Sequence, residues 1–162
     1  MTSTKKQFPY RSILIACSVN TARSPMAVGF LKKFLIERGI NDVEVFSGGI
    51  SSHARDGMLT SLDAKIAMEE VGILLPNDYK SIDLKKHREL IEMADFIITL
   101  TEKHKAEMKK FKESYGKPIL TMKEFAGESG DIEDPTMKGI EGFRVARDAI
   151  KKCLVKGLKK SC

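Results

Sequence analysis

The chain has 162 residues, of which 42% are hydrophobic and 31% charged, a size and composition typical of one globular domain. Lysine and arginine exceed aspartate and glutamate by 28 to 22, and the resulting charge of +6 favours anionic partners such as phosphorylated proteins. No apolar run approaches the roughly 20 residues of a membrane span, and three scattered cysteines exclude a secreted disulfide framework. We therefore expect one cytoplasmic domain over residues 1–162 that does not bind a membrane. Because no aromatic RNA-binding motif is present, we do not expect a nucleic acid as partner either.

Short apolar runs alternate along the chain with longer segments of helical periodicity. In chain order, the pattern predicts strand 12–16, a helix from Pro25 to Gly39, strand 43–46, helices 59–72 and 84–93, strand 95–100, helix 102–112, strand 117–122 and a last helix carrying residues 143–158. Residues 47–49 (Ser-Gly-Gly) are predicted to form a sharp turn. Each connection is long enough for a crossover, so we expect an α/β three-layer sandwich with a four-stranded parallel sheet.

The segment between the first strand and the first helix is the candidate site, because parallel sheets bind ligands at the carboxyl ends of their strands. It begins with Cys17 and reaches Arg23 just before the helix. Unpaired N–H groups and the positive end of a helix suit a phosphate dianion, and an arginine can hold two of its oxygens. The same field favours the thiolate of Cys17, and Ser24 can donate its hydroxyl to that sulfur. The predicted phosphate-binding residues are Ser18, Val19, Asn20, Thr21, Ala22 and Arg23.

This loop resembles the signature Cys-x-Gly-Asn-x-Cys-Arg-Ser-Pro of the low-molecular-weight protein tyrosine phosphatases. The matched positions are Cys17, Asn20, Arg23, Ser24 and Pro25. Further motifs agree in order and spacing, namely residues 47–49, 101–105 and the Asp-Pro at 134–135. The resemblance covers about residues 12–158 and implies the flavodoxin-like fold of that family.

The resemblance also implies a mechanism that needs no metal or cofactor. Cys17 would attack phosphorus to form a cysteinyl-phosphate, and Arg23 would bind the phosphoryl oxygens. Asp134 would protonate the leaving atom and then activate water, with Asp131 as the nearest rival for this role. Asn20 tolerates left-handed backbone, and its amide would tie the loop to Ser47. Free phosphate would be the product and an inhibitor.

Departures from the signature bear on the substrate. Val19 stands where the family has glycine, and a β-branched side chain is tolerable there only if the backbone φ is negative. Ala22 replaces the family's second loop cysteine. Thr136 and Met137 replace the aromatic residues that follow Asp-Pro in tyrosine phosphatases. At position 21 this chain resembles the bacterial protein arginine phosphatases, a branch of the same family that also has threonine there.

The predicted activity is therefore hydrolysis of phosphotyrosine or phosphoarginine on proteins, with Thr21 favouring phosphoarginine. Two alternatives stay open. One is a phosphate-binding module impaired by Val19, and the other is a thiol-dependent arsenate reductase that uses Cys153 or Cys162. The histidines at 87 and 104 read as surface groups, and Tyr79 reads as an ordinary tyrosine.

Overall fold

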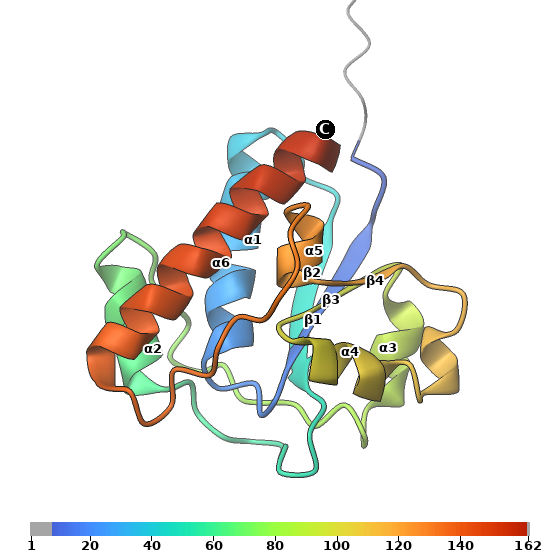
Figure 1. Ribbon diagram of the computed structural model, residues 1–162, viewed down its shortest axis with the longest axis horizontal. Helices are drawn as coiled ribbons and strands as arrows, with labels where there is room; N and C mark the ends of the chain where they lie inside the picture. Colours follow the sequence, from blue (N-terminus) through green and yellow to red (C-terminus); the bar gives the residue numbers. More distant parts are fainter. Residues whose placement is uncertain (1–7, 162) are drawn as a thin grey trace, which may run out of the picture.

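The computed structural model describes residues 8–161 and contains one parallel sheet (Figure 1). Its strands are β1 (Ser12–Cys17), β2 (Glu44–Gly49), β3 (Phe96–Thr99) and β4 (Ile119–Thr121), in the order β2-β1-β3-β4. All three pairings are parallel, which confirms the predicted α/β fold with a four-stranded parallel sheet.

The helices that cover the sheet are α1 (Arg23–Glu37), α2 (Leu62–Glu69), α3 (Arg88–Met93), α4 (Glu102–Met108), α5 (Met122–Phe125) and α6 (Gly139–Ser161), with a 3-10 turn at Lys112–Ser114. None of them combines the length and apolarity that crossing a bilayer requires, over the residues described. Cys162 lies outside those residues.

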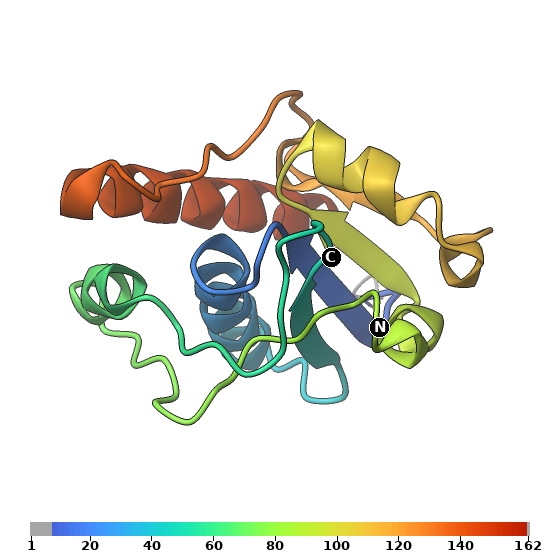
Figure 2. The same cartoon turned by 90° about the horizontal axis from the view of Figure 1, so that it is seen from below.

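The central strand β1 places its side chains alternately on the two faces of the sheet. Ile13 and Ile15 join the core under α1, α5 and α6, and Leu14 and Ala16 join the smaller core under α3 and α4. Figure 2 shows these layers on either side of the strands. Burial on both faces explains why β1 reads as a continuous apolar run, as strands of parallel sheets do.

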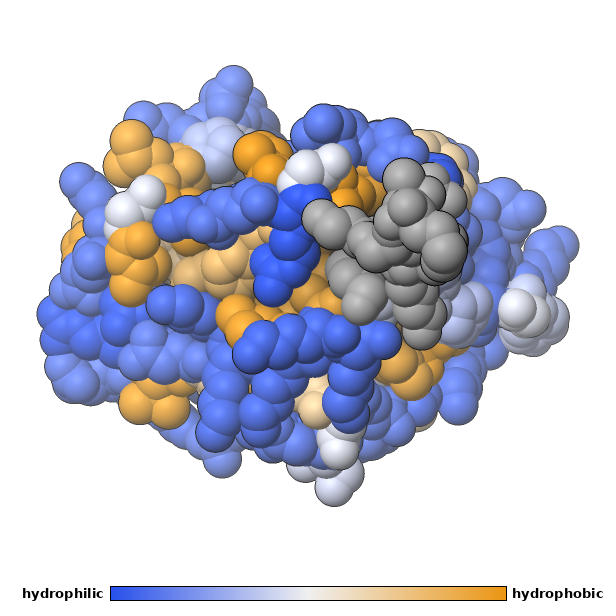
Figure 3. All heavy atoms as spheres, turned by 90° about the horizontal axis from the view of Figure 1, so that it is seen from above, coloured by the Kyte–Doolittle hydropathy of each residue, from blue (hydrophilic) through white to orange (hydrophobic). Residues whose placement is uncertain are grey.

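The carboxyl ends of the strands and the connecting loops lie at the lower edge in Figure 1. Figure 3 shows the opposite face from above, where hydrophilic side chains cover most of the surface and apolar groups lie between them. The candidate loop lies at the lower edge, because Cys17 ends β1 there and Arg23 begins α1.

The predicted sharp turn at 47–49 is wrong, because these residues form the end of β2. The two glycines are there for close packing. A Cβ on Gly48 would lie 2.5 Å from two side-chain carbons of Leu84, and a Cβ on Gly49 would lie 2.8 Å from the carbonyl oxygen of Ser18. The two glycines thus let Leu84, from the turn before α3, and the candidate loop approach β2 at van der Waals distance.

Several predicted helices are longer than the observed ones. α3 begins at Arg88 and not at 84, because Leu84 is used to fill the space beside β2. The short helix α5 was not predicted, although Thr121 and Glu124 form a capping box at its start.

Candidate active site

Cys17 closes β1 and is 2% exposed, with its sulfur facing the first turn of α1. The Ser24 hydroxyl lies 2.9 Å from the Cys17 Sγ. The Asn20 Nδ2 lies 2.8 Å from the same hydroxyl and 2.9 Å from the Ser47 hydroxyl. The structure thus brings together three predicted loop residues and Ser47, around a sulfur at the carboxyl end of the central strand.

The orientation of the Asn20 amide fixes where the protons lie. Its Oδ1 accepts a hydrogen bond from the Ile82 backbone N–H at 3.0 Å, so its NH2 group must face the two serines. Each serine oxygen then accepts from Asn20 and keeps its own proton to donate. The Ser24 proton is thus available to the Cys17 sulfur, and a Cys17 thiolate would accept it and be stabilised by it.

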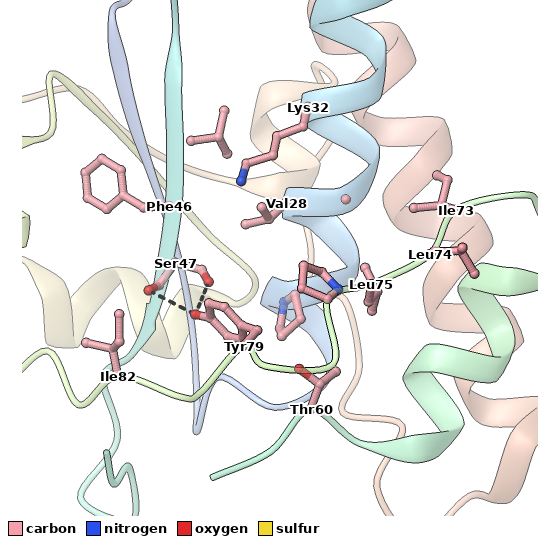
Figure 4. Close-up of a pocket in the computed structure, with 14 residues that line it drawn as sticks. Val28, Lys32, Phe46, Ser47, Thr60, Ile73, Leu74, Leu75, Tyr79 and Ile82 are labelled. Atoms are coloured by element: carbon pink, nitrogen blue, oxygen red, sulfur yellow. Dashed lines mark hydrogen bonds between the residues drawn. The ribbon is translucent and has the colours of Figure 1, made fainter. Parts of the chain in front are cut away.

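Tyr79 completes this network and was missed from the sequence. Its hydroxyl donates to the Asn20 Oδ1 at 2.7 Å. The same hydroxyl lies 2.8 Å from the Ser47 hydroxyl (Figure 4). Burial raises the pKa of Tyr79 above its ordinary value, against the hydrogen bonds of Ser47 and Asn20, so the phenol stays protonated and able to donate. Tyr79 lies in an irregular stretch without periodicity, and no signal in the sequence connects it to the loop.

The backbone of the loop leaves its amides free. The N–H groups of residues 18–22 have no acceptor within the part of the chain described. Asn20 adopts left-handed backbone with φ 65°, as predicted for the residue that turns the loop, whereas Val19 is not among the described residues with positive φ. The objection that Val19 distorts the loop therefore loses its physical basis.

Arg23 is 5% exposed and reaches the segment that carries the predicted acid. It donates to the Ile132 carbonyl at 2.8 Å and lies 3.8 Å from the Asp134 Oδ2. Asp131 is engaged elsewhere, because its Oδ1 accepts from the Glu102 N–H at 2.8 Å, at the start of α4. Asp134 is thus the carboxylate beside the arginine, and Asp131 anchors the loop.

The environment of Asp134 sets its protonation. Burial by itself would raise the pKa of this carboxyl, but hydrogen bonds from Thr136 and the charge of Arg23 outweigh it and hold the pKa below its usual value. The Thr136 N–H donates to the Asp134 Oδ1 at 3.0 Å. A phosphate dianion that engaged Arg23 would reverse this balance and favour the protonated carboxyl.

His104 is not a surface group, contrary to the prediction. It is 5% exposed in α4, with its Nδ1 buried and without a hydrogen-bond partner among the described residues. Burial, followed by the charge of Arg23, lowers the pKa of His104 to about 4, so the ring is neutral at physiological pH. His104 and Met108 are four residues apart and share the buried face of α4. The lysines around them make the segment read as polar throughout, so the sequence did not indicate this face. His87 is a partly exposed side chain that contacts Asp56.

Cys153, which the arsenate reductase alternative needs as a second thiol, is buried in the C-terminal half of α6. Burial raises the pKa of Cys153 and disfavours its thiolate, and its charged neighbours include Lys123 and Glu128. The structure thus places Cys153 in the core, in the part of α6 beside α5, and not in a loop at the site.

Comparison with known proteins agrees with this geometry. The sequence profile described as low molecular weight phosphotyrosine protein phosphatase matches residues 12–161. Protein-arginine-phosphatases of Geobacillus stearothermophilus and Bacillus subtilis are 38% and 33% identical over 144 and 152 residues, covering 88% and 91% of this chain and 89% and 97% of theirs. The low molecular weight protein-tyrosine-phosphatase PtpB of Staphylococcus haemolyticus is 30% identical, covering 82% of this chain and 86% of its own.

A solved structure shows the same arrangement of elements. YwlE arginine phosphatase, in a Cys-to-Ser mutant with a phosphorylated active-site serine, superposes with a TM-score of 0.82 at 30% identity, covering 92% of this chain and 94% of that one. Profile, sequence relatives and fold all agree, and this chain belongs to the low molecular weight phosphotyrosine protein phosphatase family.

Proposed function

We propose that this protein hydrolyses phosphoarginine on proteins through a phosphoryl group carried on Cys17. The observation that supports it most is the Asn20 network, which aims the Ser24 hydroxyl at the Cys17 sulfur inside a loop of free amides. A dianion held by those amides and by Arg23 would have its phosphorus in front of the thiolate.

The reaction has two steps, transfer of the phosphoryl group to the Cys17 sulfur and then its transfer to water. The Cys17 thiolate attacks phosphorus, the P–N bond of phosphoarginine breaks, and protonated Asp134 gives its proton to the leaving guanidine nitrogen. The Asp134 carboxylate then takes a proton from water, whose oxygen attacks phosphorus while the S–P bond breaks. Inorganic phosphate leaves and the thiolate is restored. The phosphorylated serine of the YwlE mutant supports a phosphoryl transfer to this position.

Two observations favour phosphoarginine over phosphotyrosine. Two of the reported relatives are protein-arginine-phosphatases. In addition, Thr21 is partly exposed on the loop, where its hydroxyl would contact a polar guanidine better than a phenyl ring. Phosphotyrosine remains the second candidate because PtpB is also similar over most of the chain.

The test compares kcat/KM on two versions of one peptide, carrying phosphoarginine or phosphotyrosine. We expect the wild type to prefer phosphoarginine, and Thr21→Ile to move the ratio toward phosphotyrosine by about tenfold, or ~1.4 kcal/mol. Wild-type preference for phosphotyrosine would overturn the substrate assignment, and an unchanged ratio in Thr21→Ile would remove Thr21 as its determinant.

The nucleophile is tested on the same peptides. Cys17→Ala should lose at least about 10³-fold in kcat, whereas Cys153→Ala should keep its activity. The arsenate reductase alternative instead predicts no turnover of these peptides, together with thiol-dependent reduction of arsenate that is lost on replacing Cys153 or Cys162.

A further inference from the structure

A cavity of about 420 Å³ lies behind the phosphate loop, between α1, β2 and the segment 73–82 (Figure 4). None of residues 17–24 lines it, so the proposed reaction does not use it. Most of its walls are aliphatic or aromatic, including Val28, Phe46 and Leu75. Its volume is within the range of pockets that hold small molecules.

One positive charge borders these apolar walls. Lys32 is the charged side chain among the described lining residues, and it extends from α1 toward β2 across the cavity (Figure 4). It has no hydrogen-bond or ion-pair partner within residues 8–161. An apolar cavity with one free ammonium group fits an aliphatic molecule that carries one negative charge.

Thr60 provides an independent indication of a ligand. It is 6% exposed and lines the cavity, and its hydroxyl is buried with no partner in the described structure. A buried hydroxyl without a partner is costly in a folded protein, and a ligand atom that accepts its hydrogen bond removes that cost.

The cavity shares its walls with the network that holds the loop. Tyr79 and Ser47 line it and also bond with Asn20, and Ile82 both lines it and donates to Asn20 through its backbone. Beside Thr60, the Ser61 N–H donates to the Thr21 carbonyl at 2.8 Å. A ligand packed against the Tyr79 ring therefore favours the arrangement in which the phosphate loop is formed.

We propose that this cavity binds a linear aliphatic carboxylate, with its carboxylate on Lys32 and its chain against the apolar walls, and that occupancy tightens phosphate binding at the Cys17 loop through Tyr79. The coupling is reciprocal, so bound phosphate tightens the carboxylate by the same factor. Binding to the cavity is independent of catalysis, and only the coupling relies on the proposed phosphate site.

The probes are octanoate and 1-octanol, which share a chain and differ in charge, titrated against the full chain by protein-observed NMR. We expect saturable octanoate binding with chemical-shift changes at residues of the cavity. Binding should be about fivefold weaker in Lys32→Met and unchanged in Lys33→Met, because both lysines are exposed but only Lys32 lines the cavity. Octanol, which has no charge, should bind Lys32→Met and Lys33→Met with equal affinity. An 8-hydroxyoctanoate probe should bind more tightly than octanoate in wild type but not in Thr60→Val.

The coupling is measured as the dissociation constant of inorganic phosphate with and without octanoate. Saturating octanoate should tighten phosphate about fivefold in wild type, and Tyr79→Phe should still bind octanoate but lose the effect. Non-saturable octanoate binding, or equal binding to Lys32→Met and Lys33→Met, overturns the site. Unchanged phosphate affinity in wild type overturns the coupling, and failure of phosphate to bind at all overturns the proposed phosphate loop and not the cavity.

Discussion

At the scale of single residues, the Asn20 amide decides the chemistry of the site. One backbone N–H from Ile82 fixes which end of the amide faces the serines, and this orientation leaves the Ser24 proton available to the Cys17 sulfur. The buried amide uses both of its N–H bonds and accepts two hydrogen bonds. Such fully satisfied networks hold one geometry, whereas partly satisfied ones are costly.

Removing the Tyr79 hydroxyl tests this network. In Tyr79→Phe, the Asn20 Oδ1 loses one of its two donors and Ser47 loses its acceptor. We expect a loss of about 1–3 kcal/mol in the free energy of unfolding and a roughly 5- to 30-fold lower kcat/KM. Urea denaturation and steady-state kinetics measure both. Tyr115→Phe is the matched control, because Tyr115 is 68% exposed. Equal behaviour of the two variants would contradict the role of Tyr79.

The protonation of Asp134 predicts a pH dependence. Its pKa is held below the usual value in the free protein, and only the protonated carboxyl can donate to the leaving group. The kcat/KM value, which reports the free protein, should therefore fall as pH rises through the acidic range in which Asp134 loses its proton. Asp134→Asn should abolish this fall and lower kcat by about 10²–10⁴-fold. Asp131→Asn is the control, since its amide oxygen can still accept from Glu102. A wild-type pH profile in Asp134→Asn would exclude Asp134 as the acid.

At the scale of secondary-structure elements, β2 depends on the close approach of Leu84 to Gly48. A methyl group at Gly48 would overlap the Leu84 side chain, so Gly48→Ala should destabilise the fold by about 1–3 kcal/mol. Leu84→Ala should cost about 2–5 kcal/mol by leaving a cavity. The double variant should lose about 0.5–3 kcal/mol less of the free energy of unfolding than the sum of the losses in the two single variants, measured by urea denaturation. Strict additivity would show that the contact does not limit β2.

The element scale also shows how far the sequence could predict the fold. The buried runs of β1 and β3 and the periodicity of α1 were sufficient to predict the parallel sheet and the loop at Cys17. The glycines at 48 and 49 were misread as a turn, because local patterns do not distinguish a turn from a close tertiary contact. Helix α3 was predicted too long for the same reason, since Leu84 is apolar but packs from a loop.

At the scale of the whole molecule, the site is assembled from segments far apart in the chain. Cys17, Arg23 and Asp134 could be named because their motifs stand in the expected order. Tyr79 and His104 could not, since their places depend on tertiary packing. Tyr79 reaches Asn20 from an irregular segment, and His104 is a buried residue of α4, between two lysines in the sequence. A single sequence contains local motifs, but it does not encode these contacts in any local pattern.

The most direct test of the account is where the phosphoryl group goes during one turnover. Wild-type protein is mixed with a phosphoarginine peptide, quenched rapidly, digested, and analysed by mass spectrometry. We predict one transient phosphoryl group on the peptide that contains Cys17, absent in Cys17→Ala, which should also be inactive. Turnover with no phosphorylated Cys17, or a phosphoryl group on another side chain, would contradict the account.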